Sequence, residues 1–157
     1  MKPVGPVPRL PTDPDVELEI PAQRRELHWT VLAVVSAGGV LGALARYGIG
    51  HAWPTPPGGF PWATFVINVT GCLLIGTLMV LVTDVFAAHH LVRPFLGVGV
   101  LGGYTTFSTY AVEIRNLIVA GAPGAAAFYL LATLAAALAA VLAGMTAARF
   151  VNRLVTA

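Results

Sequence analysis

The chain has 157 residues, of which 57% are hydrophobic and only 10% are charged, and its mean hydropathy is +0.79. A chain of this length cannot bury so many apolar side chains in one soluble core, so we expect an integral membrane protein. The net charge of +2 is small, and the charged residues lie mostly outside the apolar runs, which argues against a nucleic-acid partner.

The first 28 residues differ in composition from the rest. They contain six of the twelve prolines and five of the seven acidic residues. This segment has too few apolar residues to bury a core. We therefore predict a disordered N-terminal tail over 1–28 and a membrane domain over 29–157. No apolar core follows a basic start, so the segment does not have the pattern of a cleaved secretory signal.

The first predicted membrane span runs from Trp29 to about Gly50, which is long enough to cross a hydrocarbon layer about 30 Å thick. Gly38 and Gly42 form a GxxxG pair, on which another helix can approach closely. Arg46 closes the span. From the residues alone it is either an interfacial anchor or a fixed positive charge at a pore mouth that concentrates anions.

A loop over 51–61 with four prolines and two glycines separates this span from the second one, Trp62 to about Val82. Asn68 lies in its first third. An amide inside a membrane helix often bonds to a neighbouring helix. Its NH₂ group also offers two uncharged donors, which can partly replace the water around a small anion.

The third predicted span begins near Arg93 and contains the sequence GVGVLGGYTTFSTY over 97–110. Gly102 and Gly103 have low helix propensity, and the hydroxyl side chains that follow compete for backbone hydrogen bonds. We therefore expect a break in this helix. Unpaired backbone groups persist in a membrane only where protein or a solvated cavity surrounds them, so the break is a candidate ion or substrate site.

Beyond the expected break, Phe107 and Tyr110 stand three residues apart and project from one side of the resumed helix. Glu113 follows, and a carboxylate this close to the membrane interior should be paired or functional. The fourth span, from about Ala125 to Arg149, is rich in alanine, and Thr133 is one of its few polar residues.

Three segments, GGVLGALARYG, FPWATFVINVTGCLLIG and GVGVLGGYTTFSTYAVE, together resemble the signature blocks of the Fluc (CrcB) family of fluoride channels. The resemblance covers about residues 30–150. It implies an all-α integral membrane protein with four transmembrane helices, the third broken at its centre, that forms an antiparallel dual-topology dimer in the cell membrane. It also implies a channel for passive fluoride export, and not an enzyme.

The resemblance further assigns roles to individual positions. It implies a structural sodium ion, which is not transported, held by the backbone carbonyls of Gly102 and Thr105. Arg46 matches a basic residue at the vestibule, and Glu113 matches an acid whose role is left open. The residues matched to the fluoride pore are Asn68, Phe107, Ser108, Thr109, Tyr110 and, more weakly, Thr133.

Tyr110 departs from the family pattern, in which a phenylalanine is usual at this position. The phenol keeps the ring edge that can face an anion. It adds a hydroxyl that would either donate to fluoride or narrow the pore. We expect conduction to persist.

The arginines near the span ends bear on the dimer. With the N-terminus inside the cell, five lie on the cytoplasmic side and two outside, which is a bias under the positive-inside rule. The five are Arg24, Arg25, Arg93, Arg149 and Arg153, and the two are Arg46 and Arg115. Both an antiparallel homodimer, which we favour narrowly, and a heterodimer with an oppositely biased relative stay open.

Two other functions remain as alternatives. A small four-helix multidrug-type exporter needs a membrane-embedded acid as its proton carrier, and Glu113 is the only candidate for that role. A non-transporting membrane subunit would use its polar residues only to join helices, and it predicts no fluoride flux.

Overall fold

The computed structural model describes residues 29–85 and 91–156 of the chain. Within these two ranges every regular element is a helix, as the composition predicts. The tail that we predict over 1–28 lies outside the described residues.

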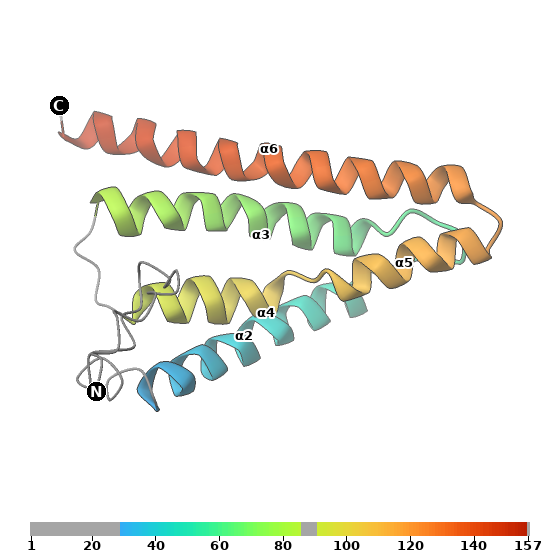
Figure 1. Ribbon diagram of the computed structural model, residues 1–157, viewed down its shortest axis with the longest axis horizontal. Coiled ribbons are helices and arrows are strands. Elements are labelled where there is room, and N and C mark those ends of the chain that lie inside the picture. Colours follow the sequence, from blue (N-terminus) through green and yellow to red (C-terminus); the bar gives the residue numbers. More distant parts are fainter. Residues whose placement is uncertain (1–28, 86–90, 157) are drawn as a thin grey trace, which may run out of the picture.

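The elements follow one another with short connections (Figure 1). They are α2 (Thr30–Ala52), α3 (Trp62–Val80), a π-helical turn (Leu81–Val85), the π-helical segment η2 (Arg93–Leu101), α4 (Gly102–Tyr104), α5 (Ser108–Val119) and α6 (Pro123–Thr156). Helix α2 continues two residues beyond the predicted end at Gly50, because the first residue that disrupts a helix is Pro54.

Three helices are long and apolar enough to cross a membrane: Thr30–Ala52, Trp62–Thr83 and Pro123–Leu154. The remaining predicted span is divided among η2, α4 and α5. None of these three pieces reaches the length of a full crossing by itself.

The helices associate as two pairs (Figure 1). Helix α3 lies along α6, and α2 lies along η2 and α4, whereas α2 and α3 touch each other little. Past the end of α4 the chain leaves α2, and α5 packs against α6. The segment between α4 and α5 therefore passes from one helix pair to the other.

Four glycines form the contact between α2 and the η2–α4 segment, and we call this contact the glycine seam: Gly38, Gly42, Gly99 and Gly103. A Cβ added to Gly38 would lie 2.5 Å from the carbonyl oxygen of Phe95, and one added to Gly99 would lie 2.8 Å from that of Val35. Backbones this close leave no space for a side chain. The GxxxG pair predicted as a helix-packing face is confirmed as one.

The opposite end of the molecule has an aromatic core. Tyr129 on α6 is fully buried, and Leu117 on α5 and Ala126 pack with it. Phe60, from the connector over 53–61, places its ring 5.1 Å from that of Tyr129, measured between centroids and nearly edge to face. This packing fixes the start of α6 beside α3 and α5, where the polar residues of the candidate site gather.

Candidate functional site

The backbone is helical through Tyr104, and helix resumes at Ser108. Thr105 between them is extended, with φ −75° and ψ 158°. Gly102 and Gly103, which we expected to weaken the helix most, are themselves helical. The helical pattern stops at the threonines that follow, so the low propensity of glycine does not set its position.

The side chain of Asn68 accounts for that position. Its Nδ2 donates to the carbonyl oxygen of Thr106 at 2.9 Å, and the Thr106 backbone N–H donates to Asn68 Oδ1, also at 2.9 Å. One amide from α3 thus satisfies both backbone groups of Thr106. Such pairing replaces the helical hydrogen bonds that a buried interruption would otherwise lose.

Thr106 in turn holds the start of α5. The Thr109 N–H donates to Thr106 Oγ1 at 3.2 Å, which is the three-residue spacing of a helix cap. Thr106 Oγ1 also donates to Thr109 Oγ1 at 3.1 Å and lies 3.3 Å from Ser108 Oγ. The hydroxyls of Ser108 and Thr109 therefore meet at Thr106, which is buried.

These bonds redirect two amides from their helical acceptors. In a continuous helix the Thr106 N–H would donate to the Gly102 carbonyl, and the Thr109 N–H to that of Thr105. The first donates instead to Asn68 and the second to the Thr106 hydroxyl. The carbonyls of Gly102 and Thr105 are thereby released from the helical ladder.

Arg46 connects the first helix to the same place. Its Nε donates to the carbonyl oxygen of Gly103 at 3.1 Å. Gly103 belongs to the glycine seam, so the positive charge lies at the carboxyl end of α4, where it complements the helix dipole. In the single chain Arg46 binds backbone and is half-buried.

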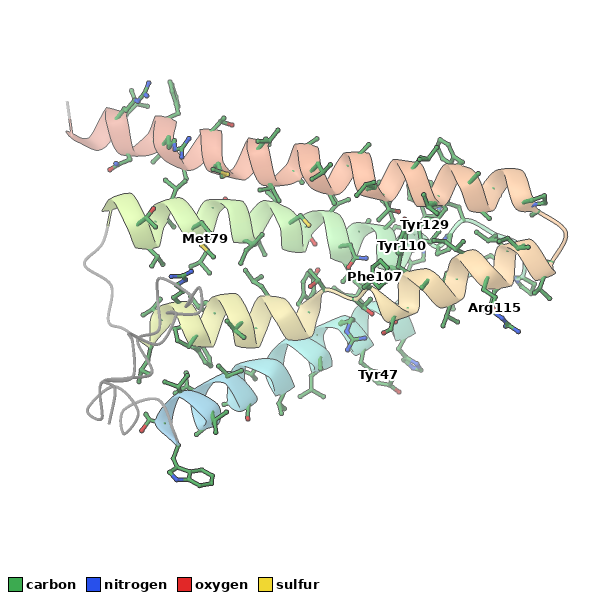
Figure 2. The ribbon with its side chains drawn as sticks, viewed as in Figure 1. Tyr47, Met79, Phe107, Tyr110, Arg115 and Tyr129 are labelled. Atoms are coloured by element: carbon green, nitrogen blue, oxygen red, sulfur yellow. The ribbon has the colours of Figure 1, made fainter. Side chains whose placement is uncertain are left out.

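Three aromatic rings group beside the start of α5 (Figure 2). The centroids of Phe107 and Tyr110 are 5.9 Å apart, and those of Tyr110 and Tyr129 are 5.2 Å apart. The Tyr110 hydroxyl donates to the carbonyl oxygen of Leu130 on α6 at 2.7 Å. In this arrangement the proton of the hydroxyl is directed at that carbonyl.

One cavity of about 400 Å³ lies against the interruption. Six of the residues that we predict for the pore or the sodium ion line it: Asn68, Gly102, Thr105, Phe107, Tyr110 and Thr133. Thr133 is 5% exposed, and its Oγ1 is the one buried side-chain polar atom without a hydrogen-bond partner in the described residues. Phe107, by contrast, is 79% exposed in the single chain.

A second cavity, of about 440 Å³, lies beneath the connector over 53–61. Thr109 and Glu113 line it, whereas Ser108 and Arg46 line neither of these two cavities. Glu113 accepts hydrogen bonds from Thr64 Oγ1 at 2.8 Å and from the Tyr129 hydroxyl at 2.7 Å. The expectation that this carboxylate is paired is confirmed, and its partners come from α3 and α6.

The sequence reasoning did not select Thr64 or Tyr129. A signal was present, because a carboxylate in a membrane span needs donors at its own depth. Glu113 lies six residues before the end of α5, Tyr129 lies six residues after the start of α6, and Thr64 lies in the first turn of α3. Matching these depths across the connections would have identified both hydroxyls.

Comparisons with known proteins extend over most of the described chain. The family model described as "CrcB-like protein, Camphor Resistance (CrcB)" matches residues 33–145. The chain is 56% identical over 133 residues to "Fluoride-specific ion channel FluC 2" of Nocardia farcinica, covering 85% of this chain and 95% of that one. It is 55% identical over 133 residues to the protein of the same description from Streptomyces avermitilis, covering 82% and 84% of the two chains. A more distant relative, "Fluoride-specific ion channel FluC" of Agrobacterium fabrum, is 42% identical over 120 residues, or 75% and 95% of the two chains. These relatives are described as ion channels and not as enzymes.

Proposed function

This chain belongs to the CrcB-like family, and we propose that it is a fluoride-selective channel that lets fluoride leave the cytoplasm down its electrochemical gradient. It is a multi-pass membrane protein with several apolar helices. The observation that carries the proposal is the cavity at the helix interruption, where an amide, a free hydroxyl and two aromatic rings meet.

These groups suit a small, strongly hydrated anion. A channel must replace the water around such an ion with donors and still bind it weakly enough to release it. Asn68 Nδ2 has a second N–H beyond the one that Thr106 accepts, and the Thr133 hydroxyl has no hydrogen-bond partner among residues 29–85 and 91–156. The edges of aromatic rings carry the positive part of the quadrupole, so Phe107 and Tyr110 can face the anion.

None of these groups changes its protonation state as the anion passes, so conduction needs no proton transfer. The multidrug-type alternative loses support from the same geometry. Glu113 is the one acid in the helices that we assign to the membrane, and both of its carboxylate oxygens accept hydrogen bonds from buried side chains. A proton carrier that exchanges with substrate would have to break both bonds in each cycle.

The crossing count and the dimer are part of the proposal. We assign the fourth crossing to η2, α4 and α5 together, and the functional unit to an antiparallel dimer. Phe107 supports the dimer, because its ring lines the cavity and is 79% exposed in the single chain. A second subunit would cover this ring and close the cavity. The homodimer and the heterodimer with an oppositely oriented relative are the two forms of this assembly.

A sodium ion at the dimer centre is consistent with the released carbonyls. Hard cations prefer oxygen ligands, and backbone oxygens without helical donors are suitable ones. The carbonyls of Gly102 and Thr105 meet this condition, because their helical donors bond elsewhere. When bound, the ion would neutralise these partial charges. The hydrogen bonds of Asn68 and Thr106 would hold the helix interruption in place around the ion.

The proposal is tested by fluoride efflux from liposomes that contain the purified protein and a potassium gradient. We expect fluoride to leave when valinomycin allows charge balance, and chloride efflux to stay at the level of empty liposomes. Asn68→Asp should abolish efflux, because it replaces a donor with a negative charge at the cavity wall, and Phe107→Ile should reduce it strongly. Equal fluoride and chloride efflux would overturn the selectivity.

The form of the dimer is tested by expressing this chain alone and mapping the accessibility of its two termini in the membrane. A homodimer requires both orientations, together with fluoride efflux from the chain by itself. A single orientation with no efflux would exclude the homodimer.

A further inference from the structure

One turn of α3 faces the residues at which the third predicted span is interrupted. Asn68 and Gly71 are three positions apart, so they lie on the same side of α3. Asn68 binds the backbone of Thr106. Gly71 is buried, and a Cβ added to it would overlap the Cγ2 methyl of Thr105. Two successive residues of the interruption therefore rest on the same turn, one through hydrogen bonds and the other through direct packing.

The side chain of Thr105 has a fixed orientation. Its Oγ1 donates to the carbonyl oxygen of Leu101 at 2.9 Å, and its backbone N–H donates to the same oxygen at 3.0 Å. With the hydroxyl held against Leu101, the χ1 angle of Thr105 is set, and the position of Cγ2 is set with it. The methyl then meets the surface of α3 at the one residue, Gly71, that leaves space for it. Turning the methyl away would move the hydroxyl off its acceptor.

The other close neighbour of Gly71 is also a side chain. Cδ1 of Tyr104 would lie 3.3 Å from the added Cβ, and the Tyr104 hydroxyl is 3.0 Å from Oγ1 of Thr70 on the same turn. Gly76, further along α3, is different, because a Cβ there would overlap the backbone carbonyl oxygen of Val141 on α6. The missing side chain at Gly76 lets two helix backbones approach each other. The missing side chain at Gly71 instead accommodates a methyl group at the helix interruption.

Thr105 is the residue at which the backbone becomes extended after α4, and both Thr105 and Gly71 line the cavity beside the interruption. We propose that Gly71 is a positioning residue for conduction: by receiving the Thr105 methyl, it fixes the orientation of Thr105 and so the shape of the cavity wall. A methyl group at position 71 would take this space. Thr105 would then have to turn about χ1 or shift its backbone, and either movement changes the wall. The inference rests on the proposed fluoride conduction, and it gives a role to a residue that has no side chain to offer the ion.

The functional test compares fluoride efflux from liposomes for Gly71→Ala with and without Thr105→Ser. Gly71→Ala should lower the efflux rate by about tenfold, as for the loss of one hydrogen bond that shapes the site. Thr105→Ser removes Cγ2 and keeps the hydroxyl, so the double variant should be faster than Gly71→Ala, although it carries one more change at the site.

Two controls show whether the rescue is specific. Thr77 also donates to the carbonyl four residues earlier, at 3.0 Å, but it lies six residues beyond Gly71, about 9 Å along the helix. Gly71→Ala with Thr77→Ser should therefore stay as slow as Gly71→Ala. Gly76→Ala should lower the melting temperature in detergent, because the Val141 carbonyl cannot turn aside, and adding Thr105→Ser should give no recovery there.

The outcomes separate this inference from the proposed function. If the unchanged chain conducts, an unaltered rate for Gly71→Ala would overturn the positioning role while conduction stands. A double variant no faster than Gly71→Ala would also overturn it. If Gly71→Ala does not fold, the same comparison is made with the yield of folded protein in place of the efflux rate. Absence of fluoride efflux from the unchanged chain would instead count against the proposed function.

A second measurement is independent of transport. Threonine labelled with ¹³C at its methyl group gives an NMR signal for Thr105, which is assigned by its absence in Thr105→Ser. The ¹³C shift of this methyl depends on χ1, so we expect the signal to move in Gly71→Ala. The methyl signal of Thr146, which is exposed on α6, should stay in place and is the internal reference. A Thr105 signal at the same position in Gly71→Ala and in the unchanged chain would overturn the inference.

Discussion

The glycine seam and the polar junction around Thr106 both hold helices together, but by opposite means. At the seam, α2 and η2–α4 approach so closely that an added Cβ at Gly42 would overlap the carbonyl oxygen of Val100. At the junction, the backbone is interrupted, and the side chain of Asn68 on α3 takes over its hydrogen bonds. The seam depends on the absence of side chains at its glycines, whereas the junction depends on the presence of particular polar side chains.

The difference follows from the environment. Lipid tails are as apolar as leucine, so helices in a membrane gain little from burying apolar surface and depend on close packing and polar contacts. The seam uses close packing and keeps regular helices in place. The junction uses polar contacts, and a cavity lies beside it. A rigid seam next to an interrupted helix is a suitable arrangement for a site that must hold its shape while an ion passes.

The largest effect is expected at the seam. A Cβ at Gly42 would overlap the Val100 carbonyl oxygen and lie 2.7 Å from the backbone nitrogen of Tyr104, and neither atom can rotate away. Gly42→Val should therefore cost about 3 kcal/mol or more and prevent recovery of a monodisperse protein after detergent extraction. Gly48→Val is the control, because a Cβ there meets no atom within 4 Å. Recovery of Gly42→Val with the melting temperature of the unchanged protein would show that the two helices are not in contact.

A smaller effect is expected where the polar side chains join three helices. Glu113→Gln replaces one of the two acceptor oxygens with an NH₂ group, so either Thr64 or Tyr129 loses its acceptor and the other keeps only an uncharged one. We expect a loss of about 2 kcal/mol in stability, measured by thermal unfolding in detergent. Arg115→Gln on the same helix is the control, since that side chain is exposed and points away from α6 (Figure 2). An unchanged melting temperature for Glu113→Gln would contradict the three-helix link.

The smallest effect is expected at Arg46, where the two regions meet. Arg46→Gln removes a charge from the carboxyl end of α4 and should lower fluoride efflux about twofold at low salt, since exposed or half-exposed charges act weakly. The difference should shrink as the ionic strength rises, because the Debye length falls from about 30 Å at 0.01 M to about 10 Å at 0.1 M. A difference that does not depend on salt would mean that Arg46 acts only as a structural tether.

Much of the architecture could be predicted from local sequence. The apolar runs that begin near Trp29, Trp62 and Ala125 predict the starts of the three long helices to within two residues, because each run must cover the bilayer thickness. The last helix, α6, continues seven residues beyond the predicted end at Arg149. The GxxxG pair predicts a packing face, and Glu113 predicts a paired carboxylate. Each of these follows from the cost of a single group in an apolar environment.

The details of the site could not be predicted in the same way. Glycine propensity predicts a weakness at Gly102 and Gly103, but the helix includes both glycines and ends at Tyr104, because Asn68, 38 positions away from Thr106, binds the backbone of that residue. For the Tyr110 hydroxyl the sequence leaves open a donor to the anion or a steric obstacle, whereas in the structure the hydroxyl donates to the Leu130 carbonyl. In both cases the decisive partner is on another helix.

From its sequence alone this protein is determined to be a helical membrane protein with polar residues at particular depths, because hydrophobicity and backbone pairing are local requirements. The tertiary structure decided which of those polar groups satisfy one another and which are left over. It released the carbonyls of Gly102 and Thr105 from the helical ladder and left the Thr133 hydroxyl without a partner in the part of the chain that the structure describes. The physical reason is that a hydrogen bond saturates its donor, so the group available to a ligand is known only after every neighbour has been placed.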